Sequence, residues 1–429
     1  MNKQTWLQVL SAYFGWLMDG YTTIAYALVA TTIAPLFFPS NIGVLALIAT
    51  FGGFAVEALA RPIGALVFGN YLGDKLGRRN MLVITILGFS ILAGSKGLLP
   101  TYSVIGIFAP IILYIILFFE GMFAGAEYGG GTTLSMESVP AKYRSPIGAF
   151  VQSGFGTGYF IVSFVFAALY EFYGASGFST IGWRVLFYTT FIPGIITLII
   201  RYITKETDVF EKMKEKKEIM KIPLAGLIKK GGRPLIFALM FTTGLLFINT
   251  ITFSFYPSIF FLTQPGISGA TVGTYVALIN LVSLFGVWFG GLLAMLIPGR
   301  RLTIIIYTII FIILTYPIAY FAFTGSAEQK FIMFSIQAFF EAMIFATLPA
   351  FLAETFSKTF RATGVGFAYN GGAIVGGFGI SIVLSTEALF RSLFISWTVW
   401  LFIMSILALI SMILSRETWK RGMPDAIEA

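Results

Sequence analysis

The chain has 429 residues, of which 57% are hydrophobic and only 11% charged, and its mean hydropathy is +0.88. This composition excludes an ordinary soluble globular protein and indicates a chain that lies mostly in lipid. The net charge of +9 does not indicate a nucleic-acid partner, because the basic residues fall in the gaps between apolar runs. The chain has neither Cys nor His, which excludes disulfides, thiolate metal sites and the usual proton switch of neutral pH.

Twelve apolar runs follow one another along the chain, and hydrocarbon about 30 Å thick needs roughly 20 such residues per helix. Several runs are longer than this minimum, so we expect tilted or kinked helices. The start of the chain is too short for a signal n-region, and we expect the first run to be retained as a helix. The runs predict membrane helices near residues 6–30, 42–71, 80–98, 104–136, 146–170, 181–204, 233–262, 269–297, 302–323, 329–355, 363–387 and 391–415.

The basic residues predict the orientation of these helices. Most Lys and Arg lie in alternate gaps between the runs, whereas the opposite gaps, near 31–41, 99–103, 171–180, 263–268, 324–328 and 388–390, hold essentially none. Because basic loops stay in the cytoplasm, and an even number of crossings puts both termini on one side, we expect a plasma-membrane protein with both termini cytoplasmic.

The chain divides into two similar halves. A charged segment, 205–232, separates six runs from six, so we expect six-helix bundles over 1–204 and 233–429 with a cytoplasmic linker between them. The halves also repeat, because the same 217 positions separate Glu137 from Glu354 and Arg144 from Arg361. Such a repeat is expected of transporters that are built from two parallel copies of one fold.

A polar loop, Gly73-Asp74-Lys75-Leu76-Gly77-Arg78-Arg79, lies between the second and third runs. It resembles the signature loop of the major facilitator superfamily of transporters, although Asn70 stands where the family has a Gly. The resemblance implies an all-α membrane protein of twelve transmembrane helices in two pseudo-symmetric six-helix bundles, working by alternating access. The resemblance also implies a gate on the cytoplasmic side, made of Asp74, Arg78, Arg79, Glu137, Arg144, Glu354 and Arg361. The alternative for this loop is a solvated surface turn.

Several charged residues lie near the middle of apolar runs. A carboxylate in hydrocarbon costs roughly 2.5–3.5 kcal/mol on insertion scales, so each is a candidate for function. Glu57 and Arg61 are four residues apart on one helix and can pair. The pair is either a structural ion pair or a site where Arg61 binds an anionic group of a substrate. The run Arg61-Pro62-Ile63-Gly64 also resembles the second helix of metabolite:proton symporters within the superfamily.

Asp19 and Glu127 are the candidates for proton coupling. Asp19-Gly20-Tyr21 resembles the first-helix motif of organic-acid symporters, but Thr22 and Thr23 occupy the stretch where a second acid commonly follows. The run from Glu120 to Gly130 resembles the metabolite:proton symporters, and Glu127, two turns after Glu120, takes the acidic position of that group. The alternatives are a packing role for Asp19 and a buried structural role for Glu127.

Other polar and aromatic side chains could line a cavity between the halves. The candidates for substrate binding, besides Arg61 and Glu57, are Tyr128, Asn249, Tyr256, Asn280 and Glu341. Glu341 has no partner that the sequence predicts. Lys96 and Arg184 lie close to the ends of runs, where their long side chains can reach the membrane surface.

These features predict a secondary active transporter and not an enzyme. The chain has no Walker-type phosphate loop and no nucleophile–base pair, so we expect no cofactor and no ATP-driven step. The partners expected are protons, the lipid bilayer and a small-molecule substrate, which we expect to be an organic acid or other carboxylate. We expect a monomer. A sugar or polyol transporter, an uncoupled facilitator, a drug exporter and a membrane sensor are the alternatives.

Overall fold

The fold is all helical over the residues that the computed structural model describes, 3–39, 43–72, 78–205, 223–357 and 361–419. The first half contains α1 (Lys3–Phe37), α2 (Val44–Gly64) with the π-helix η2 (Ala65–Leu72), α4 (Arg78–Ser95) with η3 (Lys96–Leu98), α5 (Tyr102–Ile105), α6 (Phe108–Glu137), η4 (Ala141–Tyr143), α7 (Arg144–Gly177), η5 (Phe178–Gly182), α8 (Trp183–Tyr188) and α9 (Phe191–Ile203). The second half contains α11 (Pro223–Thr252), α12 (Tyr256–Thr263), α13 (Gly269–Leu293), α14 (Arg300–Thr324), α15 (Ala327–Ala346), α16 (Leu348–Thr355), α17 (Arg361–Gly377), α18 (Gly379–Phe390) and α19 (Leu393–Leu414).

The described helices cross a membrane twelve times, as the sequence predicts. Eleven helical stretches are long and apolar enough to span hydrocarbon, and one of them, Ala141–Ile203, has 63 residues. At 1.5 Å per residue this stretch is about 95 Å long, roughly three times the thickness of the hydrocarbon layer. It is interrupted at Gly174, whose φ of 65° suits glycine, so α7 makes one crossing and η5, α8 and α9 make the next.

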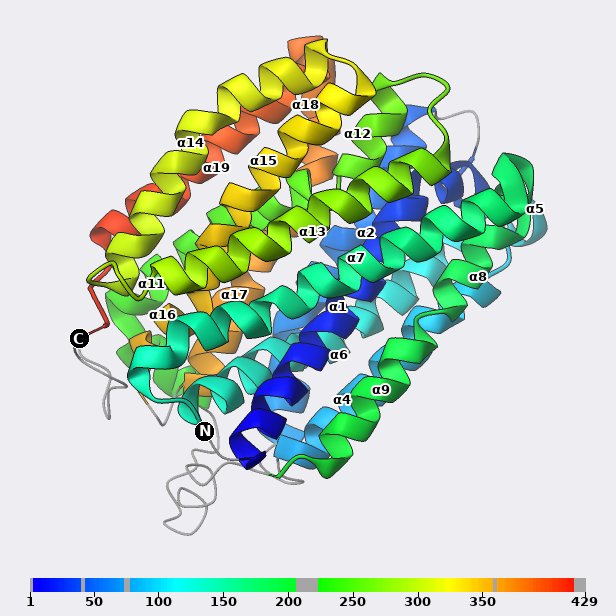
Figure 1. Cartoon of the computed structure of the whole chain (residues 1–429). Helices are drawn as coiled ribbons and strands as arrows, with labels where there is room; N and C mark the ends of the chain where they lie inside the picture. Colours follow the sequence, from blue (N-terminus) through cyan, green and yellow to red (C-terminus); the bar gives the residue numbers. More distant parts are fainter. Residues whose placement is uncertain (1–2, 40–42, 73–77, 206–222, 358–360, 420–429) are drawn as a thin grey trace.

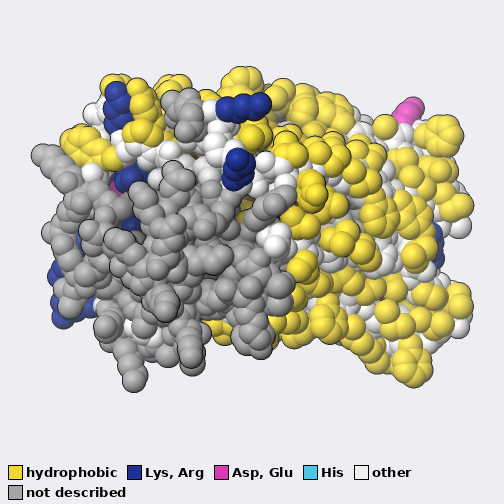
Figure 2. Space-filling model, turned by 90° about the horizontal axis from the view of Figure 1, so that it is seen from below, with side chains coloured by type: hydrophobic (Ala, Val, Ile, Leu, Met, Phe, Trp, Pro, Cys, Tyr) yellow, Lys and Arg dark blue, Asp and Glu magenta, His cyan; other side chains and the backbone are white. Residues whose placement is uncertain are grey.

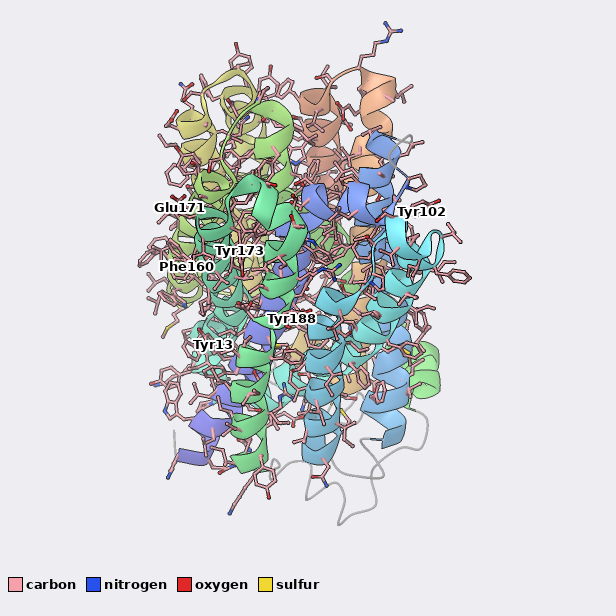
Figure 3. All side chains as sticks on the ribbon, turned by 90° about the vertical axis from the view of Figure 1, so that its right-hand side faces the viewer. Tyr13, Tyr102, Phe160, Glu171, Tyr173 and Tyr188 are labelled. Atoms are coloured by element: carbon pink, nitrogen blue, oxygen red, sulfur yellow. The ribbon has the colours of Figure 1, made fainter. Side chains whose placement is uncertain are left out.

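The helices run side by side, and α1 begins at the same end of the molecule at which α19 finishes (Figure 1). We call this the terminus end, and the opposite end the far end. In Figure 3, Tyr102, Glu171 and Tyr173 lie toward the far end and Tyr13 lies nearer the terminus end. Figure 2 shows hydrophobic side chains over the right-hand part of one face, whereas most visible Lys and Arg lie in its left half, toward the terminus end. This distribution suits helices that are surrounded by lipid along most of their length.

Glycines bring the helices of the first half into backbone contact. A Cβ on Gly121 or Gly125 of α6 would collide with the backbone of Glu57 or Arg61 on α2. Gly154 and Gly158 of α7 meet the backbone of α1 in the same way. Small residues at crossings permit this close packing in membranes, and here they hold α6 against α2 and α7 against α1.

Three crossings of the second half are interrupted near their middle. Non-helical turns separate α11 from α12 at 253–255, α15 from α16 at Thr347, and α17 from α18 at Phe378. Interrupted helices expose backbone groups, which membrane proteins tolerate where the chain lines a cavity or packs on protein.

The predicted helix positions agree with the structure, with differences at their ends. The first helix extends to Phe37, beyond the expected limit of residue 30. Of the predicted linker, residues 206–222 lie outside the described part of the chain, and α11 begins at Pro223 with a break at Gly232.

Candidate functional site

Asp19, Glu57 and Arg61 form one buried cluster, which we call the coupling cluster. Arg61 Nη2 lies 2.9 Å from Asp19 Oδ1 and 2.6 Å from Glu57 Oε1. The three residues are 3%, 6% and 8% exposed. The predicted pair of Glu57 and Arg61 is therefore confirmed, and the structure adds Asp19 from α1 as a second carboxylate on the same guanidinium.

The coupling cluster faces a cavity between the two halves. Its other walls come from both halves and consist of Thr23, Phe54, Phe155, Leu246, Asn249, Thr250, Ser254, Tyr369, Ala373 and Gly377. With all three groups ionised, the cluster carries one more negative than positive charge. Because an unpaired charge inside a membrane protein is costly, this cluster can take up a proton or the cationic group of a ligand.

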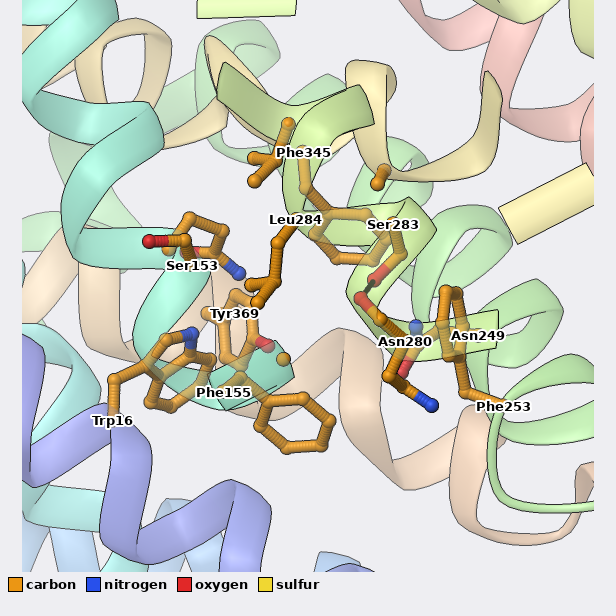
Figure 4. Close-up of a pocket in the computed structure, with 14 residues that line it drawn as sticks. Trp16, Ser153, Phe155, Asn249, Phe253, Asn280, Ser283, Leu284, Phe345 and Tyr369 are labelled. Carbon is orange, nitrogen blue, oxygen red and sulfur yellow. Dashed lines mark hydrogen bonds between the residues drawn. The ribbon is translucent and has the colours of Figure 1, made fainter. Parts of the chain in front are cut away.

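A second cavity, whose lining Figure 4 shows, shares Phe155, Asn249 and Tyr369 with the first. Its walls are aromatic or carry uncharged polar groups, and they include Trp16, Gln152, Ser153, Gly156, Phe253, Asn280, Ser283, Leu284, Val287, Ala342 and Phe345. The buried Nε1 of Trp16 and Oε1 of Gln152 have no hydrogen-bond partner among the described residues. These atoms are free to bind a polar group that enters the cavity.

Aromatic rings join the halves next to this second cavity. Tyr128 of α6 stacks on Tyr369 of α17, with ring centroids 3.5 Å apart, and Trp16 lies 4.8 Å from Tyr128 and 5.5 Å from Tyr369. Tyr128, a predicted binding residue, thus supports two residues that line the cavity and is not itself among the lining residues of either cavity.

Of the candidates in the second half, Asn249 and Asn280 line the cavity, as predicted. Glu341 is fully buried behind Asn249, and its Oε1 accepts hydrogen bonds from Asn249 Nδ2 at 3.3 Å and Thr252 Oγ1 at 3.1 Å. Tyr256 is not among the lining residues of either cavity, because the turn at 253–255 directs its hydroxyl to Gln337, 2.8 Å away. Of the predicted binding residues of the second half, the two asparagines are thus the ones that line a cavity.

Glu127 lies in a separate cluster within the first half. Its carboxylate pairs with Arg201 of α9 and accepts a hydrogen bond of 2.8 Å from Thr85 of α4. The sequence analysis missed Arg201, which is only 2% exposed, because it ends an apolar run. A signal was present, since Pro193, Thr197 and Arg201 recur every four residues and form the buried side of α9.

Lys96 does not reach the membrane surface, contrary to the prediction. It is 2% exposed, and its Nζ lies 2.8 Å from Glu120 Oε2. The 3₁₀ turn η3 at the end of α4 directs the side chain inward, over the rings of Tyr26 and Phe187. Arg184 is also held by protein, because its Nη1 donates to the carbonyls of Gly97 and Leu99.

At the terminus end, the repeated Glu and Arg residues pair across the two halves. Arg361 Nη1 lies 2.8 Å from Glu137 Oε1, and Arg144 Nη1 lies 3.3 Å from Glu354 Oε1. Each arginine also binds a carbonyl of its own half, Met136 for Arg144 and Ala353 for Arg361. The two copies of the motif thus exchange partners symmetrically.

Arg300 adds a further link at this end. Its Nε lies 3.4 Å from Glu354 Oε2, and its Nη1 donates to Ser145 Oγ of the first half at 2.7 Å. Arg300 is the counterpart of Arg78, which begins α4. Asp74 lies outside the described residues, as do the side chains of Arg78 and Arg79, so their part in the gate stays a prediction.

The halves also meet at the far end. Ser381 of α18 donates to the Ile48 carbonyl near the start of α2 at 3.1 Å. Tyr159 of α7 donates to the carbonyl of Phe253, a residue that lines the second cavity. The halves therefore contact each other beside the cavity and at the far end as well as at the terminus end.

A helical protein with twelve crossings, a polar cavity between two similar halves, and ion pairs that join the halves at one end has the architecture of a membrane transporter. A family model for the Major Facilitator Superfamily matches residues 24–327, and the chain belongs to this family.

Similar proteins support this assignment. The chain is 30% identical to the "Inner membrane metabolite transport protein YhjE" of Escherichia coli, over 86% of this chain and 84% of that protein. It is 29% identical to the "Ectoine/proline transporter ProP" of Corynebacterium glutamicum, over 83% of this chain and 73% of that protein. The solved structure of the proton:xylose symporter XylE bound to 6-bromo-6-deoxy-D-glucose has a TM-score of 0.78 and 18% identity and covers 98% of both chains, which shows a common fold. The protein is thus a multi-pass membrane transporter of small metabolites.

Proposed function

We propose that the protein carries a small carboxylate-bearing metabolite across the plasma membrane together with protons. The observation that carries this proposal is the coupling cluster, in which one guanidinium holds two carboxylates at the wall of the central cavity. A substrate carboxylate that binds Arg61 displaces Asp19 or Glu57, and the displaced side chain takes up the proton. One proton is then taken up for each substrate carboxylate that binds Arg61.

Relatives and the cavity walls are consistent with this substrate class. Proline and ectoine, which ProP is named for, both carry a carboxylate. The second cavity offers rings and uncharged polar groups, including Trp16, Gln152 and Asn280, to the rest of such a molecule. The same uncharged lining favours a sugar or polyol as the second candidate, since these solutes need hydrogen bonds and no cation.

Transport would proceed by movement of the two halves, 1–204 and 233–429, with 205–232 as their connection. The pairs Glu137–Arg361 and Arg144–Glu354 would close the terminus end, which we place in the cytoplasm because its loops are basic. Their separation would open the cavity to that side and release the metabolite and the proton.

Purified protein in liposomes tests the proposal, with proline, ectoine, succinate and xylose as probes and an imposed pH gradient as the driving force. We expect a carboxylate probe to accumulate only when the outside is acidic. Arg61→Lys keeps the charge but loses the planar fork that can hold two carboxylates, so we expect uptake to fall by about tenfold or more. Arg184→Lys, which alters an arginine remote from both cavities, is the matched control and keeps most of its uptake.

Uptake of xylose alone, unaffected by Arg61→Lys, would instead support the sugar transporter. Uptake of a carboxylate at the same rate with and without the pH gradient would show an uncoupled facilitator. A ligand that binds only the folded protein stabilises it by about 2.7 kcal/mol when the ligand concentration is a hundred times its Kd. The melting temperature of the protein then rises, which gives a second readout of binding.

A further inference from the structure

A second buried ion pair lies beside the coupling cluster and has no part in the function proposed above. Lys96 and Glu120 are each 2% exposed, and both oxygens of Glu120 bind Lys96 Nζ, at 3.0 and 2.8 Å. Lys96 stands near the far end of α4, and Leu98, two residues later, is 70% exposed. The pair is thus buried within the first half but close to one surface of the protein.

The packing of α2 against α6 places Glu120 next to Glu57. Gly121 follows Glu120 directly and meets the backbone of Glu57 so closely that a Cβ would collide with it. Glu120 consequently interacts electrostatically with Glu57 and Asp19 as well as with Lys96. The ionisable side chains around Glu120 are Lys96 on η3, Glu57 and Arg61 on α2, and Asp19 and Tyr26 on α1, whereas Arg184 on α8 turns to the carbonyls of Gly97 and Leu99.

The charges in this group do not balance. The carboxylates are Asp19, Glu57 and Glu120, and the cations are Arg61 and Lys96, so one carboxylate lacks a cation when all are ionised. Because an excess buried charge is costly, the binding of one proton to this group of three acids is favoured.

We propose that Glu120 and Lys96 form a proton-exchange site, through which protons pass between the far end and the coupling cluster inside the first half. This inference rests on the proton coupling proposed above. A proton that enters from the far end converts the Glu120 carboxylate to the acid and releases it from Lys96. Transfer of that proton to Glu57 then restores the pair of Lys96 and Glu120, so the route leaves the substrate cavity free for the metabolite.

Two variants separate a proton-transfer role from a structural one. Glu120→Gln removes the acid but leaves Lys96 buried without its partner, which can prevent folding. The double variant Lys96→Met with Glu120→Leu removes both charges, and replacement of a buried ion pair by apolar residues of similar size is often neutral for stability. Lys330→Met is the matched control, because Lys330 is equally buried near the far end of the second half, where its Nζ donates to the Ala322 carbonyl and lies 5.0 Å from the ring of Phe323.

The first readout compares coupled and uncoupled modes in liposomes with proline and ectoine as probes. We expect the double variant to lose probe-driven proton uptake by about tenfold or more, because a positioned proton-transfer group is worth at least that much. Counterflow, which exchanges labelled for unlabelled probe without net proton movement, should stay within about twofold of the unmodified protein. Lys330→Met should keep both activities.

Retention of proton uptake by the double variant, or an equal loss of both modes, would overturn the inference and leave a structural ion pair. Transport of both probes by the unmodified protein without proton movement would refute the proposed coupling, and the inference with it.

A second readout needs no substrate and tests Glu120 directly. Infrared titration of the detergent-purified protein should show the carbonyl band of a protonated acid that is absent from the double variant Lys96→Met with Glu120→Leu. If no such band appears at any pH at which the protein stays folded, Glu120 exchanges no proton, and the inference fails even for a proton-coupled transporter.

Discussion

Replacement of Glu354 by Gln should loosen the closure of the terminus end. The Glu354 side chain is fully buried and faces Arg144 at 3.3 Å and Arg300 at 3.4 Å, and it also accepts a hydrogen bond of 3.0 Å from Thr418. Gln has nearly the same size but no charge, so the variant leaves two arginines without this acid. The contact with Arg144 across the halves and the contact with Arg300 within the second half both become weaker, whereas the pair of Glu137 and Arg361 remains.

The size of the effect follows from the geometry. Removal of one member of a buried charge pair costs about 2–5 kcal/mol, and distances of 3.3–3.4 Å place this site in the lower part of that range. A loss of about 2–3 kcal/mol from the closed state shifts the balance between closed and open forms by roughly 30- to 140-fold, since each 1.4 kcal/mol is tenfold.

The absence of Cys from the chain makes the assay direct, because a single introduced Cys is the only thiol. Ala350 is fully buried at the terminus end, in a cluster with Met136 of the first half. Ala167 is buried at the far end, where its Cβ faces Gly273 of the second half. We expect Glu354→Gln to speed maleimide labelling of Ala350→Cys by one to two orders of magnitude, and to slow or leave unchanged the labelling of Ala167→Cys.

An unchanged rate at Ala350→Cys would refute the assignment of Glu354 to closure. Equal acceleration at both reporters would show a general loss of structure and not an opening at one end. Glu171→Gln is the control, because Glu171 is an exposed acid toward the far end (Figure 3) and its replacement should alter neither rate.

Three further substitutions test the packing that supports the site, each by thermal unfolding in detergent. Gly121→Val should destabilise the protein by about 1–3 kcal/mol, because the new side chain would collide with the α2 backbone. Gly130→Val should cost far less, because a Cβ there would lie 3.5 Å from its nearest neighbour, Leu82 Cδ2. Equal costs would contradict the close contact at Gly121. Thr85→Val should cost about 1.5–3 kcal/mol through loss of its hydrogen bond to Glu127, and an unchanged melting temperature would argue against an ionised Glu127. Glu417→Gln should cost about 0.3–1 kcal/mol, because the Glu417 carboxylate accepts from two backbone N–H groups at the start of α14, and no loss at low salt would exclude that role.

The sequence predicts the helices well because a membrane helix is defined by length and apolarity alone. It also predicts that the pairs Glu137/Arg144 and Glu354/Arg361 do equivalent work, since one offset relates them. The exchange of partners between the copies could not be predicted, because within each copy the acid and the arginine are seven residues apart and could equally pair locally. Only the packing of the two halves decides between these arrangements.

Depth in the membrane is the quantity that the sequence predicts least well. Lys96 and Arg201 both stand at the ends of apolar runs, where a long basic side chain normally reaches the surface. In the structure, a 3₁₀ turn and a buried helix side direct them inward, to Glu120 and Glu127. Their partners are carboxylates that the sequence already marks as anomalous in an apolar run. A rule that seeks a cation for each buried acid, even at a run end, would have found both pairs.

The distribution of these ion pairs indicates that the two halves have different roles. In the first half, Asp19, Glu57, Glu120 and Glu127 each have a basic partner within the membrane-spanning helices. In the second half, the buried acid at the same depth, Glu341, binds an amide and a hydroxyl and has no basic partner among the described residues. The second half faces the cavity with amides, hydroxyls and rings, which can distinguish ligand shapes but cannot balance a charge. We therefore expect substitutions that uncouple transport from protons to fall in the first half, and substitutions that change substrate selectivity without uncoupling to fall in α11, α13 and α17.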